Sequence, residues 1–515
     1  MRRVAVGRRL ALFLAIGIAV SGCSATGESG GVVRGQAVAG APNLIVIVTD
    51  DQTASQFSRR TMPRAHRFLV DAGIEFTNAV VTTPLCCPSR AAFLTGQYGH
   101  NNGVVANTYL NLRDKQNVLP AWLQHAGYTT AHVGKFLNNY AKSLDDPAGA
   151  SPGWDEWFTV LEPERYGDYA VSDNGAVVEY GWDPRDHLTR VLNDRTVQVV
   201  ERLAREPDPF YLQVDHYAPH AGKGNSGGGC PGGAAPERRD RGRFHSENLP
   251  AKDSFDGSVA DKARFVGALP KLDRREIERI RARWRCGLEA LAGVDRGIER
   301  LVTALRRTGE LDDTAIAFTS DNGYFYGEHR IAAGKHFPYE EGIRVPLVIR
   351  PPKLRGAARG TQSDAPVANI DLAPTLLELA SATPCISEER CREIDGRSMV
   401  PLLSGSASKW PSRPLLIEID LPPSNSGKWA RPCRYRAVRE AGHVYINYTS
   451  GGRPGHACEE IDEEELYSLA DDPVQNRNLL AEPSAADERL ARRLRETVAR
   501  LEYCHGRAPA LEGCP

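Results

Sequence analysis

The sequence has almost no excess of charge of either sign. Its 64 Lys and Arg residues are balanced by 65 Asp and Glu residues, so the formal net charge is −1 at pH 7. A chain without a basic field has no general attraction for a phosphate backbone, and we therefore expect no nucleic-acid partner. No internal repeat is visible either, so a repeat architecture is not indicated.

The N-terminal segment lacks an apolar run long enough to cross a bilayer, because its apolar stretch covers only residues 10–20. A basic stretch precedes it, and the sequence Val20-Ser21-Gly22-Cys23, which is similar to a bacterial lipobox, ends it. This order is typical of a targeting segment, and it predicts a signal peptide over residues 1–22. The basic residues are Arg2, Arg3, Arg8 and Arg9.

Cys23 at this position predicts a lipid attachment site. Residues 23–42 are rich in Gly, Ser, Ala and Val, which is typical of a flexible tether. We therefore expect an exported protein on the outer face of the bacterial cell membrane, which contacts the membrane only through a lipid on Cys23. Plain secretion is the alternative.

The bulk composition is that of a soluble globular protein, with 41% hydrophobic and 25% charged residues. A chain of 515 residues is too long for one simple core, so we expect two domains. A change of pattern near residue 405 places the boundary, with a large domain over residues 43–404 and a small one over residues 405–515.

Apolar runs and amphipathic segments alternate through the large domain. This alternation predicts an α/β fold with a mostly parallel central sheet flanked by helices. Strands are expected over residues 43–48, 75–81, 129–133, 210–214, 314–320 and 344–350. Helices are expected over residues 62–72, 119–126, 186–205, 271–307 and 371–379, with a break or kink in the fourth near Gly287 and Gly293.

Oxygen-bearing side chains follow two of the buried strands. Asp50 and Asp51 come after the strand at residues 43–48, and Asp321 and Asn322 come after the strand at residues 314–320. In open α/β sheets, ligands bind at the carboxyl ends of the strands. If the two strand ends are neighbours, their four side chains suit Ca²⁺ or Mg²⁺, whereas separate solvated turns are the alternative.

The stretch from Thr83 to Gly96 contains a thiol, a proline and an arginine at close spacing. A helix beginning near Ser89 would hold Cys86 at its N-terminus, where the free N–H groups favour anions. Arg90 would then reach the same site at i+4 spacing, and the thiol would be exposed as a candidate nucleophile. A buried structural cysteine pair or half of a zinc site is the alternative.

Three further positions are candidates for anion binding or proton transfer. Lys135, at a strand end, is either a charge for an anion or a surface lysine. His216 and His220 both follow the strand at residues 210–214, and either is a general acid or a structural histidine. Lys335 lies beyond Asp321. The Gly- and Arg-rich residues 221–257 predict a surface loop that could border the site.

The small domain has a different pattern. Short strands are expected over residues 414–419, 435–438 and 443–448, followed by an acidic loop over residues 459–465. Residues 487–503 predict a helix with an apolar face consisting of Leu490, Leu494, Val498 and Leu501. We expect an antiparallel sheet covered by this helix, which makes the small domain α+β.

The Cys86-x-Pro88-Ser89-Arg90 pattern resembles the signature of the sulfatase family. Residues 134–140, 152–154, 319–324, 367–372, 395–398 and 466–473 also resemble that family, so the likeness extends over residues 43–505. It is strongest to the N-acetylglucosamine-6-sulfatase and heparan sulfate 6-endosulfatase branch. The resemblance implies an alkaline-phosphatase-like fold and hydrolysis of a sulfate ester on a 6-O-sulfated N-acetylglucosamine-like sugar.

The resemblance also implies roles for individual residues. Cys86 would be converted to formylglycine by dedicated formylglycine-generating machinery, and the hydrated aldehyde would attack sulfur. One Ca²⁺ would be bound by Asp50, Asp51, Asp321, Asn322 and the residue derived from Cys86. Arg90, Lys135 and Lys335 would hold the sulfate, and His220 would protonate the leaving alcohol.

One position departs from the family pattern. Many sulfatases carry a histidine two residues after the lysine of the Gly-Lys pair, where this chain has Leu137. The base that would return the aldehyde is therefore unassigned, with His132, His329 and His336 as candidates. Two other functions stay open, namely hydrolysis of phosphate or phosphonate esters, and glycan binding by a lipoprotein in which Cys86 is unconverted.

Export permits disulfide bonds, and eleven cysteines are present. Cys385–Cys391 and Cys504–Cys514 are close enough in sequence to close small loops. Cys230–Cys286 and Cys433–Cys458 are then plausible and leave Cys87 free, but spacing alone leaves the connectivity open.

Overall fold

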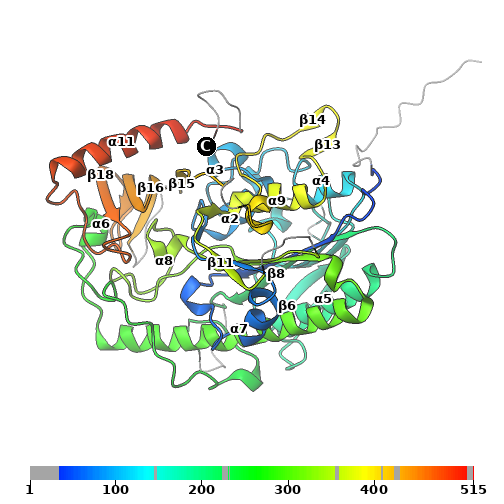
Figure 1. Ribbon diagram of the computed structural model, residues 1–515. Coiled ribbons are helices and arrows are strands. Elements are labelled where there is room, and N and C mark those ends of the chain that lie inside the picture. The colour runs from blue at the N-terminus through cyan, green and yellow to red at the C-terminus, as the bar shows by residue number, and fades with distance from the viewer. Residues whose placement is uncertain are drawn as a thin grey trace, which may run out of the picture. The chain divides into compact units, whose positions relative to one another are not determined.

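Figure 1 shows the protein as a computed structural model. It describes residues 34–143, 146, 148–222, 230, 232–353, 359–406, 410–422, 430–506 and 514. The predicted signal peptide and Cys23 lie outside these residues. Among the described helices, none is both long and apolar enough to span a membrane. Residues 34–42 form no helix or strand and are held to the fold by a hydrogen bond from Gly35 N to His125 O.

A ten-stranded sheet forms the centre of the large domain. Its five inner strands, those at Thr314–Ser320, Asn43–Asp50, Phe210–Pro219, Thr129–Gly134 and Glu156–Val160, run parallel to one another. The strands at Leu347–Arg350, Tyr169–Asp173 and Ala176–Tyr180 pair antiparallel with their neighbours. The predicted mostly parallel sheet is therefore confirmed. In spatial order the strands are β11 (Thr361–Ser363), β2 (Ile74–Phe76), β10 (Leu347–Arg350), β9 (Thr314–Ser320), β1 (Asn43–Asp50), β8 (Phe210–Pro219), β4 (Thr129–Gly134), β5 (Glu156–Val160), β6 (Tyr169–Asp173) and β7 (Ala176–Tyr180).

Helices cover both faces of this sheet, which explains why its inner strands are apolar throughout. Leu44 and Val46 of β1 pack into one core with the helices at residues 119–125 and 372–379, whereas Ile45 and Ile47 pack into another with the helices at residues 188–203 and 274–308. Figure 1 shows these two helical layers above and below the sheet. The helices are α1 (Pro63–Ala65), α2 (Cys86–Thr95), α3 (Gly99–Asn102), α4 (Leu119–His125), α5 (Leu188–Leu203), α6 (Arg264–Gly267), α7 (Arg274–Thr308), α8 (Glu340–Ile343), α9 (Leu372–Leu379) and α10 (Val400–Leu403).

The long helix α7 corrects one prediction, because it continues without a break through Gly287 and Gly293. Both glycines permit close packing instead of a kink. A Cβ on Gly287 would lie 2.8 Å from Gln56 Nε2, and one on Gly293 would lie 3.0 Å from Thr189 Cγ2. The helix therefore keeps its hydrogen bonds, and the absence of a side chain at each glycine lets neighbouring residues approach its backbone closely.

Two other predicted elements differ from the structure. The helix expected over residues 62–72 consists of the short α1 followed by a π-helical turn at His66–Val70. The strand expected over residues 75–81 is divided between β2 and β3 (Ala79–Val80), and β3 pairs with β12 (Val367–Ala368) in a separate sheet.

A four-stranded antiparallel sheet forms the C-terminal part, as predicted. Its strands are β15 (Leu415–Asp420), β16 (Arg431–Glu440), β17 (His443–Gly452) and β18 (Glu459–Ser468). Helix α11 (Ala485–Leu501) packs on it through Leu494 and Leu501, which are fully buried. The sheet shares a core with Val80, Phe337 and Ile370 of the large part. The boundary at residue 405 stays a prediction.

The predicted acidic loop over residues 459–465 is wrong, because these residues belong to β18. The negative charges of these residues do not prevent strand formation, because arginine side chains and a tyrosine hydroxyl group pair with the carboxylates. Glu463 pairs with Arg264, Glu464 pairs with Arg495, and the buried Glu465 accepts a 2.9 Å hydrogen bond from Tyr339 Oη.

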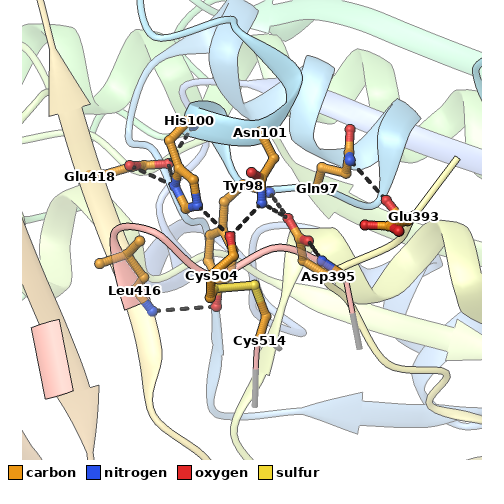
Figure 2. The surroundings of a disulfide bond; sticks show 11 residues. Gln97, Tyr98, His100, Asn101, Glu393, Asp395, Leu416, Glu418, Cys504 and Cys514 are labelled. Atoms are coloured by element: carbon orange, nitrogen blue, oxygen red, sulfur yellow. Dashed lines mark hydrogen bonds and ion pairs between the residues drawn. A yellow bond between two sulfur atoms is a disulfide. The ribbon is translucent and has the colours of Figure 1, made fainter. Parts of the chain in front are cut away.

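Four disulfide bonds are present among the described residues, and they confirm the pairing that cysteine spacing suggested. Cys86 and Cys87 are free and buried. Cys504–Cys514 closes the C-terminal segment against the large domain, as Figure 2 shows.

The segment around Cys504 is anchored by a buried imidazole. His100 Nε2 lies 3.0 Å from Cys504 O, and His100 Nδ1 lies 3.0 Å from Glu418 Oε1 (Figure 2). Both ring nitrogens therefore face acceptors, which favours the imidazolium. Burial lowers the pKa of His100, but the charge and hydrogen bond of Glu418 raise it by more, so the net shift is upward from the ordinary value of 6.5. Burial raises the pKa of Glu418, but His100 lowers it, and the net shift is downward from 4.5.

We expect His100→Asn to lower the free energy of unfolding by about 1.5–3 kcal/mol near a pH of about 5.5. The stabilisation that His100 contributes is fully present below pH 6.5, the ordinary pKa that applies to the unfolded chain. It is lost as the pH rises through the raised pKa of the folded state. Urea unfolding of both proteins across this range measures the difference, with the exposed His245→Asn as control. A difference that grows with rising pH would contradict the expectation.

Candidate active site

The carboxyl ends of β1 and β9 meet in the middle of the sheet. Thr49 pairs with Ser320, and Asp321 N donates a 3.0 Å hydrogen bond to Thr49 O. This register confirms that the two strand ends are parallel neighbours. The carboxylates of Asp50, Asp51 and Asp321 offer oxygen atoms that all lie within 4.8 Å of one another.

The backbone at Asp51 allows two consecutive residues to serve one site. In a regular strand, Asp50 and Asp51 would point to opposite faces of the sheet. Asp51 has φ +68°, in the left-handed region that Asp tolerates better than most residues, and its N–H donates to Asp321 Oδ1 at 3.2 Å. The chain thus turns at the strand end and brings both carboxylates to the same place.

Cys86 is the first residue of α2, next to this carboxylate cluster. Lys335 Nζ lies 2.6 Å from its Sγ, and Asp50 Oδ1 lies at 3.4 Å. The prediction of an exposed thiol is wrong, because Cys86 is only 2% exposed. Burial raises the pKa of the thiol and Asp50 raises it further, which outweighs the lowering by Lys135 and Lys335. The unmodified side chain is therefore a protonated thiol and a weak nucleophile.

Arg90 reaches back from α2 into the same cluster, as its spacing from Cys86 predicts. Its Nε donates to Asp321 Oδ2 at 2.9 Å, and its Nη1 lies 3.1 Å from Asp215 Oδ1. Its Nη2 lies 3.7 Å from Asp50 Oδ2 and makes no hydrogen bond to any residue that the structure describes. One buried N–H edge of the guanidinium is therefore available to an anion.

Lys135 and Lys335 hold two of the carboxylates. Lys135 Nζ lies 2.5 Å from Asp50 Oδ2, and Lys335 Nζ lies 2.5 Å from Asp51 Oδ1. Both lysines are buried, so Lys135 is not a surface residue. Burial lowers the pKa of each lysine, but Asp50 raises that of Lys135 and Asp51 raises that of Lys335. The net shifts are upward, and both side chains are cations.

Of the two candidate histidines, His216 lies within β8 and His220 directly follows it, and His220 is the one that faces the cluster. Asp50 pairs in register with Pro219, and His220 Nε2 lies 3.6 Å from Asp51 Oδ2. His220 Nδ1 lies 2.8 Å from Ala221 O, which leaves Nε2 as the nitrogen that faces the site. His216 is buried, and burial lowers its pKa to about 4.

The three candidate bases lie outside the first contacts of Cys86. His132 Nε2 lies 2.8 Å from Asp215 Oδ2, behind Arg90. His329 is fully buried, with Nε2 at 3.8 Å from Glu341. Burial lowers the pKa of His336 to about 4. Among the described residues, none of the three side chains hydrogen-bonds to Cys86, and the base stays unassigned.

Asp215 is a site residue that the sequence reasoning missed. It lies on β8, is fully buried, and links Arg90 to His132. Gly134 has φ +124°, and a Cβ there would lie 2.0 Å from Asp215 O, so only glycine permits Lys135 N to donate to this oxygen at 2.9 Å. The sequence contained a signal for it, because Asp215 follows the strand predicted at residues 210–214 as Asp50 follows the strand predicted at residues 43–48.

The donor set fits a divalent cation. Three buried cations contact four buried carboxylates, those of Asp50, Asp51, Asp215 and Asp321, so negative charge is in excess. Burial and Asp50 raise the pKa of Asp321 to about 6 despite Arg90. Asn322 Oδ1 is buried without a hydrogen-bond partner among the described residues. An unpaired amide oxygen beside crowded carboxylates is the ligand chemistry of Ca²⁺ or Mg²⁺.

Comparison with known proteins assigns this arrangement to a family. The model of the family described as Sulfatase matches residues 42–382, which is more than half of the chain. The chain belongs to the sulfatase family. Sulfatases are sulfuric ester hydrolases, so the enzyme class predicted from the sequence is confirmed.

Individual relatives agree with this assignment. The chain is 32% identical over 373 residues to a Caenorhabditis elegans protein described as an extracellular sulfatase Sulf-1 homolog. That match covers 70% of this chain but only about half, 49%, of the nematode sulfatase. A human N-acetylglucosamine-6-sulfatase is 29% identical over 494 residues, covering 90% of this chain and 85% of its own.

A solved structure shows the same fold. It is that of a protein in complex with its substrate D-glucosamine-2-N,6-O-disulfate, and it superimposes with a TM-score of 0.70 at 24% identity. The match covers 89% of this chain and 97% of the other. The sulfatase fold predicted from the sequence is therefore confirmed.

Proposed function

We propose that this sulfatase hydrolyses a sulfate ester on a sulfated sugar, with a 6-O-sulfated N-acetylglucosamine-like unit as the substrate. The observation that carries the proposal is the position of Cys86, at the start of α2 and 2.6 Å from Lys335. Arg90 and Lys135 belong to the same buried cluster. Converging cations are what a sulfate ester and its transition state require.

We further propose that residue 86 acts as formylglycine, produced from Cys86 by formylglycine-generating machinery. A hydrated aldehyde would supply the hydroxyl nucleophile that the protonated thiol of Cys86 does not. The arrangement around it supports this role, because Lys335 and the N-terminus of α2 favour an oxyanion at this position.

The roles of the surrounding side chains follow from where they lie. Arg90 Nη2 offers its free N–H edge to a sulfate oxygen, while Lys135 and Lys335 offset the charge that develops on the sulfate. His220 turns Nε2 toward the cluster and would pass its proton to the leaving alcohol oxygen.

One Ca²⁺ is proposed to be held by Asp50, Asp51, Asp321, Asn322 and the residue derived from Cys86. When bound, the ion would supply positive charge for the substrate sulfate. The unpartnered Asn322 Oδ1 and the excess of carboxylates support this ligand set.

Adding Ca²⁺ to chelator-treated protein is expected to restore sulfate release and to stabilise the fold. At about 100 times its Kd, the ion should raise the free energy of unfolding by about 2.7 kcal/mol. Denaturant unfolding with and without Ca²⁺ measures this. The increase should vanish in Asp51→Ala and persist in Asp313→Ala, whose carboxylate is exposed before β9. Equal stability with and without Ca²⁺ in the parent protein would reject the metal site.

Sulfate release from 2-, 3-, 4- and 6-sulfated sugars tests the substrate, with matched aryl sulfate and aryl phosphate included. We expect activity on the 6-sulfate and on the aryl sulfate. A preference for phosphate would instead support an esterase of the wider superfamily. Binding of sulfated glycan without turnover would support the alternative of an inactive binding lipoprotein.

Export is the localisation that the extracellular relative supports. Lipid attachment at Cys23 and the tether that follows it are proposals from the sequence, with the membrane contacted through that lipid alone. Mass spectrometry of the mature N-terminus would test them, and an unmodified N-terminus at another residue would reject the anchor.

A further inference from the structure

Arg283 of α7 lies where two loops of the active site meet. One loop follows His220, and its Gly232 O accepts a 3.2 Å hydrogen bond from Arg283 Nε. The other loop leads to Lys335, and its Ala332 O accepts a 3.0 Å hydrogen bond from Arg283 Nη1. The Cys230–Cys286 disulfide fixes the first loop to α7 one helical turn from Arg283. The position of this guanidinium is therefore set by the same segments that carry His220 and Lys335.

The charge of Arg283 is not neutralised by its partners, because both are backbone carbonyls. In the described part of the chain, no carboxylate oxygen lies within 4.0 Å of it. By contrast, Arg296 of the same helix pairs with both Glu237 and Asp240. Within the residues that the structure describes, Arg283 is thus a cation held by carbonyl groups and paired with no carboxylate.

The face of α7 that carries Arg283 lies beside the carboxylate cluster. A Cβ on Gly287, four residues and about one turn after Arg283, would lie 3.5 Å from Tyr326 Oη and 3.7 Å from Pro219 Cβ. Pro219 pairs in register with Asp50 and immediately precedes His220. Arg283 therefore lies on the side of the helix that packs against the segments carrying the site.

We propose that Arg283 binds a second anionic group of the substrate, beside the sulfate that reacts. The inference rests on the proposed function and adds a feature of the substrate to it. A guanidinium has five N–H donors in one plane, and the two carbonyls occupy only two of them. The remaining edge suits two oxygens of a sulfate or a carboxylate, and the carbonyls hold it in place before the substrate binds.

Two sources could supply this anion. One is an N-sulfate on the reacting sugar, and the other is the carboxylate of an adjoining uronate. Three substrates distinguish them: N-acetylglucosamine 6-sulfate, glucosamine 2-N,6-O-disulfate, and a disaccharide in which a uronate is joined to 6-sulfated N-acetylglucosamine.

The experiment measures kcat/KM for these substrates in the parent protein and in Arg283→Gln, Arg283→Lys and Arg285→Gln. Arg285 is a matched control, since it lies on the same helix and donates to a carbonyl, Glu247 O, at 2.9 Å. We expect Arg283→Gln to lose about 10- to 100-fold on one of the two dianionic substrates and little on N-acetylglucosamine 6-sulfate. The preference is the ratio of kcat/KM on that dianionic substrate to kcat/KM on N-acetylglucosamine 6-sulfate. Arg283→Lys should retain part of this preference, and Arg285→Gln should retain all of it.

An equal loss of kcat/KM on all three substrates in Arg283→Gln would show that Arg283 only positions the loops, and it would overturn the proposal. The absence of a loss on any of the three substrates would overturn it as well. Dissociation constants for the same ligands, measured in a Cys86→Ala background, give the preference without turnover. If the parent protein releases no sulfate but Arg283→Gln removes preferential binding of a dianion, the proposed function fails and the role of Arg283 stands. If sulfate is released and neither measurement shows a preference for a dianion, the proposed function stands and the role of Arg283 fails.

Discussion

Replacing Cys86 with Ala is expected to reduce sulfate release by at least about 10³-fold, because it removes the atom from which the nucleophile is made. The fold should persist, since the thiol fills a small buried space beside Lys335 and Asp50. The measurement is kcat/KM on the preferred sulfated sugar, combined with denaturant unfolding.

Cys87→Ala is the matched control for this experiment. Cys87 is the adjacent residue and is also free and buried, but its side chain packs in the hydrophobic core that includes Phe93 and Leu94. We expect this variant to lose stability and to keep its activity. Equal activity in the parent protein and in Cys86→Ala would remove residue 86 from the mechanism.

The mass of the tryptic peptide from Phe68 to Arg90, isolated from the native host, tests the conversion directly. This peptide contains both cysteines. If Cys86 has become formylglycine, only Cys87 will react with an alkylating reagent. If both cysteines are alkylated completely, the proposed nucleophile is absent.

Arg90→Met is expected to lower the free energy of unfolding by about 3–5 kcal/mol, because it leaves buried carboxylates without their partner. Arg90 is 3% exposed and contacts Asp321 at 2.9 Å and Asp215 at 3.1 Å, and both of these residues are buried as well. Methionine preserves the length of the side chain, so the loss reports mainly on charge and hydrogen bonding. Sulfate release should fall as well, since Nη2 has no hydrogen-bond partner among the described residues and can donate to a sulfate oxygen.

Arg344→Met controls for the loss of an arginine. Arg344 is exposed and lies 3.7 Å from Glu340, and an ion pair of this kind contributes at most about 1 kcal/mol. Unfolding in urea compares the two variants. If Arg90→Met were no less stable than Arg344→Met, the buried carboxylates would have to be compensated by other groups.

The central strands and their polar ends could be predicted from the sequence because each signal is local. A continuous apolar run such as residues 43–48 is a strand covered on both faces, and the residues that follow it must lie at the edge of the sheet. Asp50, Asp51, Asp321 and Asn322 were predicted in this way, and the parallel pairing of β1 with β9 brings them together.

Other features failed or were missed because they depend on distant residues. The glycines of α7 suggested a kink, but the helix is continuous, and neighbouring residues pack closely where a side chain is absent. The acidic residues 459–465 suggested a loop, but Arg264, Arg495 and Tyr339 compensate them in β18. The strands β6 and β7 at one end of the sheet were not predicted either, and the edge strand β7 is largely exposed, so it has no buried face to produce a pattern.

By itself, then, the sequence determined the chemical inventory of this protein: a Cys-x-Pro-Ser-Arg helix start, two carboxylate-bearing strand ends, and the lysines and histidine that follow other strands. Only the tertiary structure decided which of these groups meet. It placed His220 and not His216 at the cluster, added Asp215 behind Arg90, and buried Cys86 so that its thiol stays protonated. The physical reason is that local pattern sets the type of each element, whereas burial and charge pairing depend on the contacts between elements that are far apart in the chain.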